Sequence, residues 1–272
     1  PTIDHRGPEF AELAIECFNG IKTIFKTKNP VIIFPASGTG AWEAALVNTL
    51  NEGDHVLMVE TGHFASLWNK MAIKLGLNTE LIETNWRNGL DHLQIEKRLK
   101  LDVNQKIKAV CIVHNETSTG CTSDVRAVRQ VLDNLKHDAL LMVDSISGLA
   151  SMNYEHDNWG VDVTVSGSQK GLMLPPGLSF NAISDKALLA SKNSKMRRSY
   201  WDWNEFLEFN KSGFFPYTPA TNMLFGLKEA IAMLHEEGLE NVFKRHARYS
   251  EATRIAIQSW GLEVFCSNKD RF

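Results

Sequence analysis

The 272-residue sequence lacks the features that mark several large classes of protein. Its four cysteines include no C-x-x-C pair, and its histidines show no zinc-binding spacing such as H-E-x-x-H, so neither a disulfide scaffold nor a zinc module is indicated. The 29 basic and 32 acidic side chains nearly balance, at a formal net charge of −3, which leaves no electrostatic footprint for nucleic acid. No apolar run approaches the roughly 20 residues of a transmembrane helix, so no membrane partner is expected. Residues 1–9 carry no signal-peptide pattern, and we therefore expect reduced cysteines and a cytoplasmic location.

Short apolar runs alternate with amphipathic helical stretches through most of the chain. The runs predicted as strands are 31–34, 55–60, 80–83, 107–113, 139–143, 161–166 and 178–183. The stretches predicted as helices between them are 41–50, 65–75, 92–101 and 124–136. A continuous apolar run such as 140–143 implies a strand that is buried on both faces. The alternation predicts an α/β fold with a mostly parallel sheet covered by helices.

The pattern changes after residue 215. Two helices are predicted at 221–237 and 239–260, followed by a strand at 262–266. Because that strand has nothing to pair with, it indicates the start of a second domain. We expect a large domain at 1–260 and, at 261–272, the beginning of a truncated small C-terminal domain.

The loop Ser37-Gly38-Thr39-Gly40 joins a predicted strand to a predicted helix. Small residues let backbone N–H groups approach an anion, and the helix N-terminus adds positive potential. The loop matches neither G-x-G-x-x-G nor a Walker loop. A strand-to-helix turn with an N-cap explains it equally well, so alone it leaves an anion site as one of two interpretations.

Asp144 ends a buried predicted strand, at the sheet edge where ligands bind in open α/β folds. A carboxylate there can hold a pyridine nitrogen protonated, because a nearby opposite charge favours the cationic form. Protonation makes such a ring an electron sink. A lone aspartate in this place is more often a turn or helix cap, and that interpretation also stays open.

Lys170 follows the next predicted strand, within the stretch SGSQKG at 166–171. A Schiff-base lysine needs small neighbours that give an aldehyde access to its amine. A lone loop lysine is nearly always a solvated charge. The order of an anion loop, an aspartate and a lysine, each at the end of a strand, is what favours a catalytic lysine here.

Six stretches of the chain match a known family in order. They are ASGTGAWE at 36–43, HNETSTG at 114–120, VDS at 143–145, SGSQK at 166–170, PPGL at 175–178 and PYTP at 216–219. Over residues 4–260 the sequence resembles the alanine– and serine–glyoxylate aminotransferases of the class V family, which use pyridoxal 5′-phosphate (PLP). The resemblance implies the aspartate aminotransferase-like fold (fold type I of PLP enzymes), a homodimer, and amino acid and 2-oxo acid substrates. The expected reaction transfers the amino group of serine, alanine or a similar amino acid to glyoxylate.

The resemblance also implies roles for the residues of the three motifs. Lys170 would form the Schiff base and move the proton of the reaction, and Asp144 would pair with the pyridinium nitrogen. The residues implied on the phosphate side are Ser37, Gly38 and Thr39, with Gln169 nearby.

Further residues are implied around the cofactor. Phe64 falls where family members stack an aromatic ring, often Trp, although a plain core Phe explains it about as well. Thr117 falls where a hydroxyl meets the 3′-oxygen side of the cofactor. Thr218 matches a residue that reaches the phosphate of the partner subunit. Phe215 stands where some relatives carry Tyr, so a phenol contact to the phosphate is not expected.

One departure from the family concerns the substrate carboxylate. Family members bind it with an arginine of the small C-terminal domain, and neither Arg197 nor Arg198 stands at that position. A bidentate guanidinium fixes a carboxylate in place, so the 272-residue chain alone is expected to be a poor catalyst.

Three alternatives stay open. A cysteine desulfurase-like lyase would typically carry His before the Schiff-base lysine and a mobile catalytic Cys, whereas Gln169 precedes Lys170 here. A dinucleotide-dependent oxidoreductase would need G-x-G-x-x-G after the first strand. The third alternative is a truncated chain that binds PLP without effective turnover.

Overall fold

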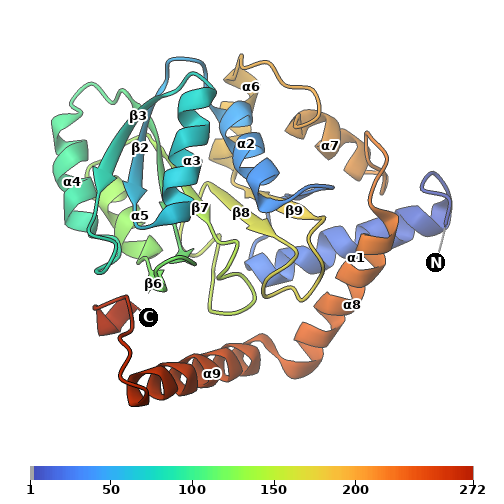
Figure 1. Ribbon diagram of the computed structural model, residues 1–272. Helices are drawn as coiled ribbons and strands as arrows, with labels where there is room; N and C mark the ends of the chain where they lie inside the picture. Colours follow the sequence, from blue (N-terminus) through green and yellow to red (C-terminus); the bar gives the residue numbers. More distant parts are fainter. Residues whose placement is uncertain (1–2, 272) are drawn as a thin grey trace.

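A seven-stranded sheet forms the centre of the fold (Figure 1). The computed structural model describes residues 3–271 of the chain. The strands lie in the order β1 (Val31–Phe34), β9 (Ser179–Ile183), β8 (Val163–Gly167), β7 (Leu140–Asp144), β4 (Ile107–Val113), β2 (His55–Glu60) and β3 (Asn78–Glu83). Strand β9 pairs antiparallel with both of its neighbours, and the other pairings of this sheet are parallel. The predicted α/β fold with a mostly parallel sheet is confirmed.

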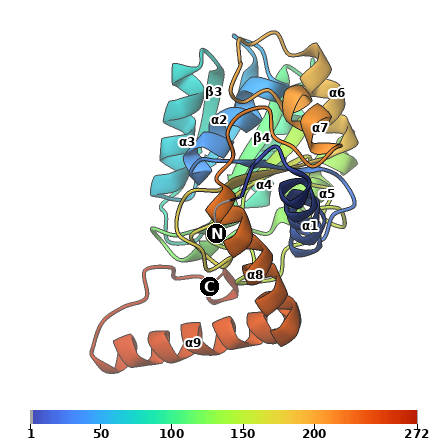
Figure 2. The same ribbon diagram turned by 90° about the vertical axis from the view of Figure 1, so that its right-hand side faces the viewer.

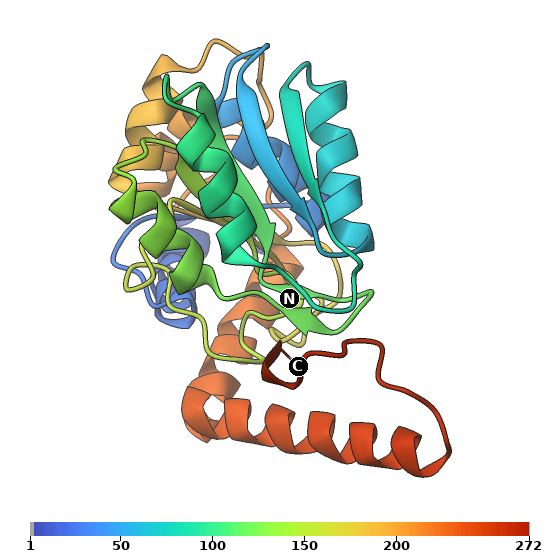
Figure 3. The same ribbon diagram turned by 90° about the vertical axis from the view of Figure 1, so that its left-hand side faces the viewer.

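Burial on both faces explains why β1 and β7 consist almost entirely of apolar residues. Every residue of β1, β7, β8 and β9 is buried. Helices α2 (Gly38–Thr49) and α3 (His63–Lys74) lie on one side of the sheet, and α4 (His92–Leu101) and α5 (Val125–Asn134) lie on the other (Figures 2 and 3). A parallel strand covered in this way has no polar face.

Side-chain caps fix where two of these helices begin. The carboxylate of Asp91 accepts the N–H of Leu93 at 3.0 Å, and that of Asp124 accepts the N–H of Ala127 at 3.0 Å. Each cap satisfies one N–H group that the first turn of a helix leaves without a partner. The predicted starts of both helices therefore agree with the structure to within one residue.

Several elements lie outside the sequence predictions. They are α1 (Pro8–Phe25), the hairpin of β5 (Asn115–Glu116) and β6 (Cys121–Thr122), α6 (Asp185–Asn193) and α7 (Trp203–Asn210). Helix α1 packs along α8, and α7 packs against β1. Both helices therefore cover the edge of the sheet that β1 forms.

The C-terminal helices agree with the prediction, but the strand after them does not. Helix α8 (Thr221–Glu237) is followed by α9 (Leu239–Ser259), which extends away from the sheet (Figure 1). The strand predicted at 262–266 is wrong: this segment is irregular, because none of the described strands lies beside it to form a ladder. The chain instead returns toward the sheet, where the N–H of Ser267 donates to the carbonyl of Arg87 at 2.7 Å. The domain boundary after residue 260 stays a prediction.

The longest helix, α9, has 21 residues, many of them charged or polar. Within residues 3–271, no helix combines the length and the apolar content that crossing a bilayer requires.

Asn181 of β9 joins three elements through buried hydrogen bonds. Its Oδ1 accepts the indole N–H of Trp203 at 3.1 Å, and its Nδ2 donates to the carbonyl of Ala41 at 3.1 Å. Trp203 is fully buried, and its backbone N–H donates to Oδ1 of Asn48 at 3.0 Å. These bonds hold α7 and α2 against β9, next to the loop that begins α2.

We expect Asn181→Leu to lower the free energy of unfolding by about 1–3 kcal/mol, because it leaves the buried indole N–H of Trp203 without an acceptor. Urea unfolding followed by circular dichroism measures the change. The matched control is Asn193→Ala on the exposed side of α6, which should stay within about 0.5 kcal/mol of the unsubstituted chain. Equal effects of the two substitutions would contradict the role assigned to Asn181.

Candidate active site

All strands of this sheet except β9 run in the same direction and end at one edge of the sheet. Five of them, β1, β2, β4, β7 and β8, are followed by predicted site residues or end in one. Residues 37–39 follow β1, Phe64 follows β2, Thr117 follows β4, Asp144 ends β7, and Gln169 and Lys170 follow β8. The carboxyl edge of the sheet therefore brings together motifs that are far apart in the sequence.

Eight of the nine predicted site residues line one cavity of about 130 Å³. Thr218 is the exception, since it lies exposed in the loop between α7 and α8. The other residues that line the cavity are Trp42, Val113, Asn115, Ile146 and Ser147.

The loop after β1 presents unused donors to this cavity. Helix α2 begins at Gly38 with Ser37 as its N-cap, and the Ser37 hydroxyl makes no capping bond. The N–H groups of Gly38 and Thr39 have no acceptor among residues 3–271. Gly38 lies close to Ile146, because an added Cβ would lie 2.3 Å from its Cδ1 atom, and the Ile146 side chain would have to move. Free donors at a helix N-terminus suit an anionic ligand group.

Asp144 is a carboxyl group held away from water at the end of β7, with only 3% of the residue exposed. Its Oδ1 accepts the N–H of Ile146 at 2.7 Å, and its Oδ2 accepts the indole N–H of Trp42 at 2.8 Å. Burial raises the pKa of Asp144 to about 7; the two hydrogen bonds lower it, and the charge of Glu116 adds to the rise. A cationic group placed in the cavity would favour the ionised carboxylate.

Glu116 holds the start of the helix that carries Phe64. The Glu116 side chain is buried, and its oxygens accept the N–H groups of Phe64 at 3.3 Å and Ala65 at 3.2 Å. Its Oε1 also accepts the hydroxyl of Ser118 at 2.7 Å, and Ser118 Oγ accepts the N–H of His63 at 2.9 Å. A carboxylate at this helix terminus satisfies the first N–H groups and interacts favourably with the helix dipole. The half-buried Phe64 ring is thereby held on the cavity wall.

Lys170 lies exposed at the cavity, on the loop after β8. Its amine forms no hydrogen bond or ion pair within residues 3–271. The loop passes close to another part of the backbone, because a Cβ added to Gly171 would lie 2.3 Å from the carbonyl oxygen of Leu149. Beside Lys170, the Oε1 atom of Gln169 is buried and has no partner among the described residues. Both side chains are therefore available to a ligand.

Sequence reasoning did not single out four residues of this region: Trp42, Asn115, Glu116 and Ser147. Asn115 and Ser147 are linked, since Nδ2 of Asn115 donates to Oγ of Ser147 at 2.9 Å. Trp42, Asn115 and Glu116 lie inside the stretches that carried the family resemblance. A signal for them was therefore present, but a role for Trp42 or Glu116 depends on a partner that only the folded chain brings near.

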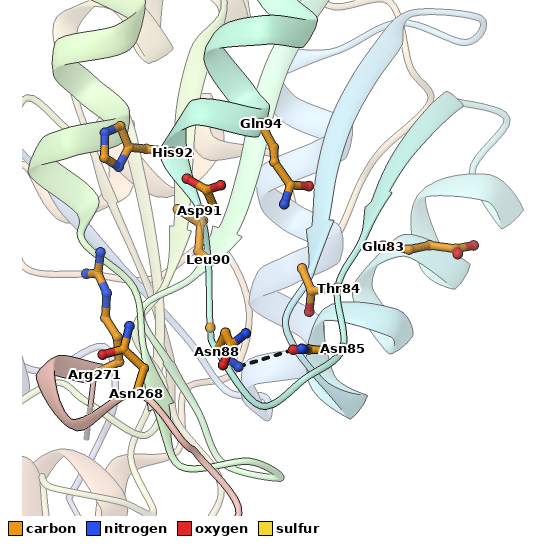
Figure 4. A pocket seen from close by; sticks show the side chains of 11 residues that line it. Glu83, Thr84, Asn85, Asn88, Leu90, Asp91, His92, Gln94, Asn268 and Arg271 are labelled. Carbon is orange, nitrogen blue, oxygen red and sulfur yellow. Dashed lines mark hydrogen bonds between the residues drawn. The ribbon is translucent and has the colours of Figure 1, made fainter.

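A second cavity, of about 780 Å³, lies beside the loop that joins β3 to α4 (Figure 4). Asn268 and Arg271 of the C-terminal segment also line it, and none of the predicted site residues does. Its Asp91 side chain already caps α4, and Figure 4 shows Glu83 directed away from His92. No group of three residues able to hold a metal ion occurs in the described part of the chain. The smaller cavity, with its buried carboxyl and its free amine, is the better candidate for chemistry.

Comparison with known proteins shows the family of the chain. A family model described as aminotransferase class-V matches residues 2–271. The serine–glyoxylate aminotransferase of Arabidopsis thaliana is 44% identical over 99% of this chain and 67% of its own length. That of Methylorubrum extorquens is 47% identical over 96% of this chain and 66% of its own length. The chain thus spans about two thirds of the length of these relatives.

The structural comparison extends the likeness to the fold. The crystal structure of an alanine–glyoxylate aminotransferase from Nostoc sp. superposes with a TM-score of 0.90 at 27% identity, covering 97% of this chain and 70% of that one. The predicted fold and the predicted resemblance are both confirmed. The chain belongs to the class-V aminotransferase family.

Proposed function

We propose that this chain binds PLP and transfers the amino group of serine, alanine or a similar amino acid to glyoxylate. One observation carries the proposal: the donor loop 37–39, the buried Asp144 and the unpaired amine of Lys170 meet at a single cavity in a class-V aminotransferase. The substrates are those named for the relatives, which are serine– and alanine–glyoxylate aminotransferases.

The residues present fit PLP at both of its charged ends. The free donors of Ser37, Gly38 and Thr39 suit the phosphate, and the buried carboxylate of Asp144 suits a protonated ring nitrogen. When bound, PLP supplies an aldehyde that captures an amine and a cationic ring that withdraws electrons.

The chain's own residues would orient the cofactor and move the proton. Phe64, Thr117 and Gln169 line the cavity. Phe64 would pack its ring against the cofactor, Gln169 would lie on the phosphate side, and Thr117 would offer a hydroxyl to the 3′-oxygen side. Lys170 would hold the cofactor through its amine, and the freed Lys170 amine would be placed to move a proton at the substrate Cα. The Asp144 carboxylate would keep the ring nitrogen of the cofactor protonated.

The desulfurase alternative has no support in the site. All four cysteines are buried in the described structure, and Gln169 precedes the lysine. Burial raises the pKa of the Cys121 thiol to about 11, so this cysteine is a poor nucleophile at neutral pH.

We further propose that the active unit is a homodimer in which Thr218 serves the partner's site. Thr218 is exposed and does not line the cavity of its own chain. Its loop is held by the stacked rings of Tyr200 and Tyr217, whose centroids lie 5.3 Å apart. An exposed hydroxyl on a supported loop suits contact with a second subunit, and a two-fold axis would place each Thr218 at the opposite cavity.

The Lys170→Ala variant should lose the covalent cofactor linkage and nearly all transamination. Borohydride reduction followed by mass spectrometry of peptides detects the linkage, and an absorbance scan follows the bound cofactor. Lys192→Ala, at an exposed lysine of α6, is the matched control and should keep both signals. A reducible linkage that persists in Lys170→Ala would overturn the assignment.

The Asp144→Asn variant should retain PLP through the phosphate loop but lose on the order of 10²–10³-fold in kcat, because an amide cannot stabilise the ring cation.

The substitution should also change the stability of the chain without the cofactor. In the free chain, folding raises the pKa of Asp144 to about 7, so the folded state binds its proton more tightly than the unfolded state does. The unfolding free energy should therefore fall as the pH rises from about 4 to about 7, and Asp144→Asn should remove this fall.

Urea unfolding of the free chain at several pH values measures the second effect, and Asp138→Asn at an exposed site is the control. An unchanged kcat at saturating PLP would rule out the role of Asp144 in catalysis. An unchanged pH slope would rule out its titration in the folded chain.

Mixing Lys170→Ala chains with Thr218→Ala chains should restore activity. Loss of a hydrogen bond to the phosphate should weaken PLP binding of the Thr218→Ala homodimer about tenfold or more, and the Lys170→Ala homodimer should be inactive. Each mixed dimer then contains one site with both residues intact. Activity at limiting PLP, measured before and after subunit exchange, tests the shared site. If both homodimers are impaired and exchange restores nothing, the proposal fails.

A further inference from the structure

Trp42 makes the one side-chain hydrogen bond to Asp144 that the structure records. It lies one turn into α2, after the loop that carries the free donors, and its indole N–H donates to Oδ2 of Asp144 at 2.8 Å. Both residues are buried, at 2% and 3% exposure, and both line the candidate cavity. The indole also stacks on Trp68, with centroids 5.9 Å apart and planes 13° from parallel.

The stacking matters because it fixes the direction of the N–H donor. Trp68 is buried, so neither ring can turn without disturbing the core. With Ile146 donating to Oδ1 at 2.7 Å, each oxygen of Asp144 has one donor and keeps one lone pair for a ligand. The carboxylate plane is therefore set before any ligand binds.

The two donors also act on the charge of Asp144. Desolvation favours the neutral acid, and a neutral acid would not attract a ring cation. A hydrogen bond donated to a carboxylate favours the ionised form. The bonds from Trp42 and Ile146 thus oppose the effect of burial on this group.

We propose that Trp42 is a positioning residue, which holds Asp144 oriented and ready to ionise for a ligand that carries a protonated ring nitrogen. The inference rests on the proposed function, because that ligand is PLP. Trp42 and the donor loop belong to the same helix, so α2 fixes the spacing between the phosphate end of the site and its carboxylate. The cavity therefore favours a ligand whose phosphate and cationic ring nitrogen are separated by the fixed distance between the donor loop and Asp144.

The test compares two ligands that differ in one atom. PLP has a ring nitrogen, and its 1-deaza analogue has C–H in that place with the same aldehyde and phosphate. Trp42→Phe keeps an aromatic ring beside Trp68 but removes the N–H donor. We expect the dissociation constant for PLP to rise about tenfold in this variant, and that for the analogue to change by less than about twofold.

Trp68→Phe is the matched control. It alters the same stacked pair, but the indole N–H of Trp68 has no hydrogen-bond partner among the described residues. This variant should leave the ratio of the two dissociation constants unchanged. Equal weakening of PLP and analogue by Trp42→Phe would show a purely structural role and overturn the proposal, as would unchanged binding of PLP.

A second measurement does not need a folded Trp42 variant. In the ¹⁵N-labelled unsubstituted chain, PLP should shift one indole N–H resonance that the deaza analogue leaves in place, and Asp144→Asn should shift the same resonance. Absence of a shared shift overturns the role of Trp42 while the cofactor assignment stands. If the unsubstituted chain binds neither ligand, the proposed function fails and this inference fails with it.

Discussion

The parallel pairing of β4, β7 and β8 determines where the chemistry lies. In the sheet, Asp144 stands opposite Val113 of β4 on one side and Val165 of β8 on the other. A shift of one residue in either register would turn the carboxylate to the opposite face of the sheet. Strands β7 and β8 are buried on both faces, so such a shift would disrupt packing on both sides of the sheet and be costly. The position of Asp144 is thus a consequence of core packing.

An ionised carboxyl group is unfavourable in that position, because it is buried away from water. It is surrounded by apolar strands, and burial raises its pKa to about 7. Two donors, the indole of Trp42 and the N–H of Ile146, reduce the cost of ionisation without adding a cation. A buried carboxylate that is hydrogen-bonded but not ion-paired is prepared for a cationic ligand, because the ligand supplies the missing charge. The sheet fixes its place, and α2 fixes its orientation.

The sheet could be predicted from the sequence, because apolar runs such as 31–34 and 140–143 mark buried strands and amphipathic stretches mark the helices between them. The site residues were expected mainly from the resemblance to the family, and eight of the nine line one cavity. The strand predicted at 262–266 does not form. An apolar, β-branched sequence describes only one segment, whereas a strand also needs a second strand to pair with. Trp42 and Glu116 were missed for a related reason. An indole becomes a donor to a carboxylate, and a glutamate becomes a helix cap, only when another element is brought against it.

Contacts between residues far apart in the sequence also link the donor loop at 37–39 to the loop that carries Thr218. A Cβ on Gly40, in the first turn of α2, would lie 2.5 Å from the Trp201 ring, so helix and ring are in close contact. The indole N–H of Trp201 also donates to Oε1 of Glu43 at 3.2 Å. Tyr200, the residue before Trp201, stacks on Tyr217, which precedes Thr218. The first turn of α2 therefore supports both the donors that face its own cavity and the loop proposed to reach the partner's.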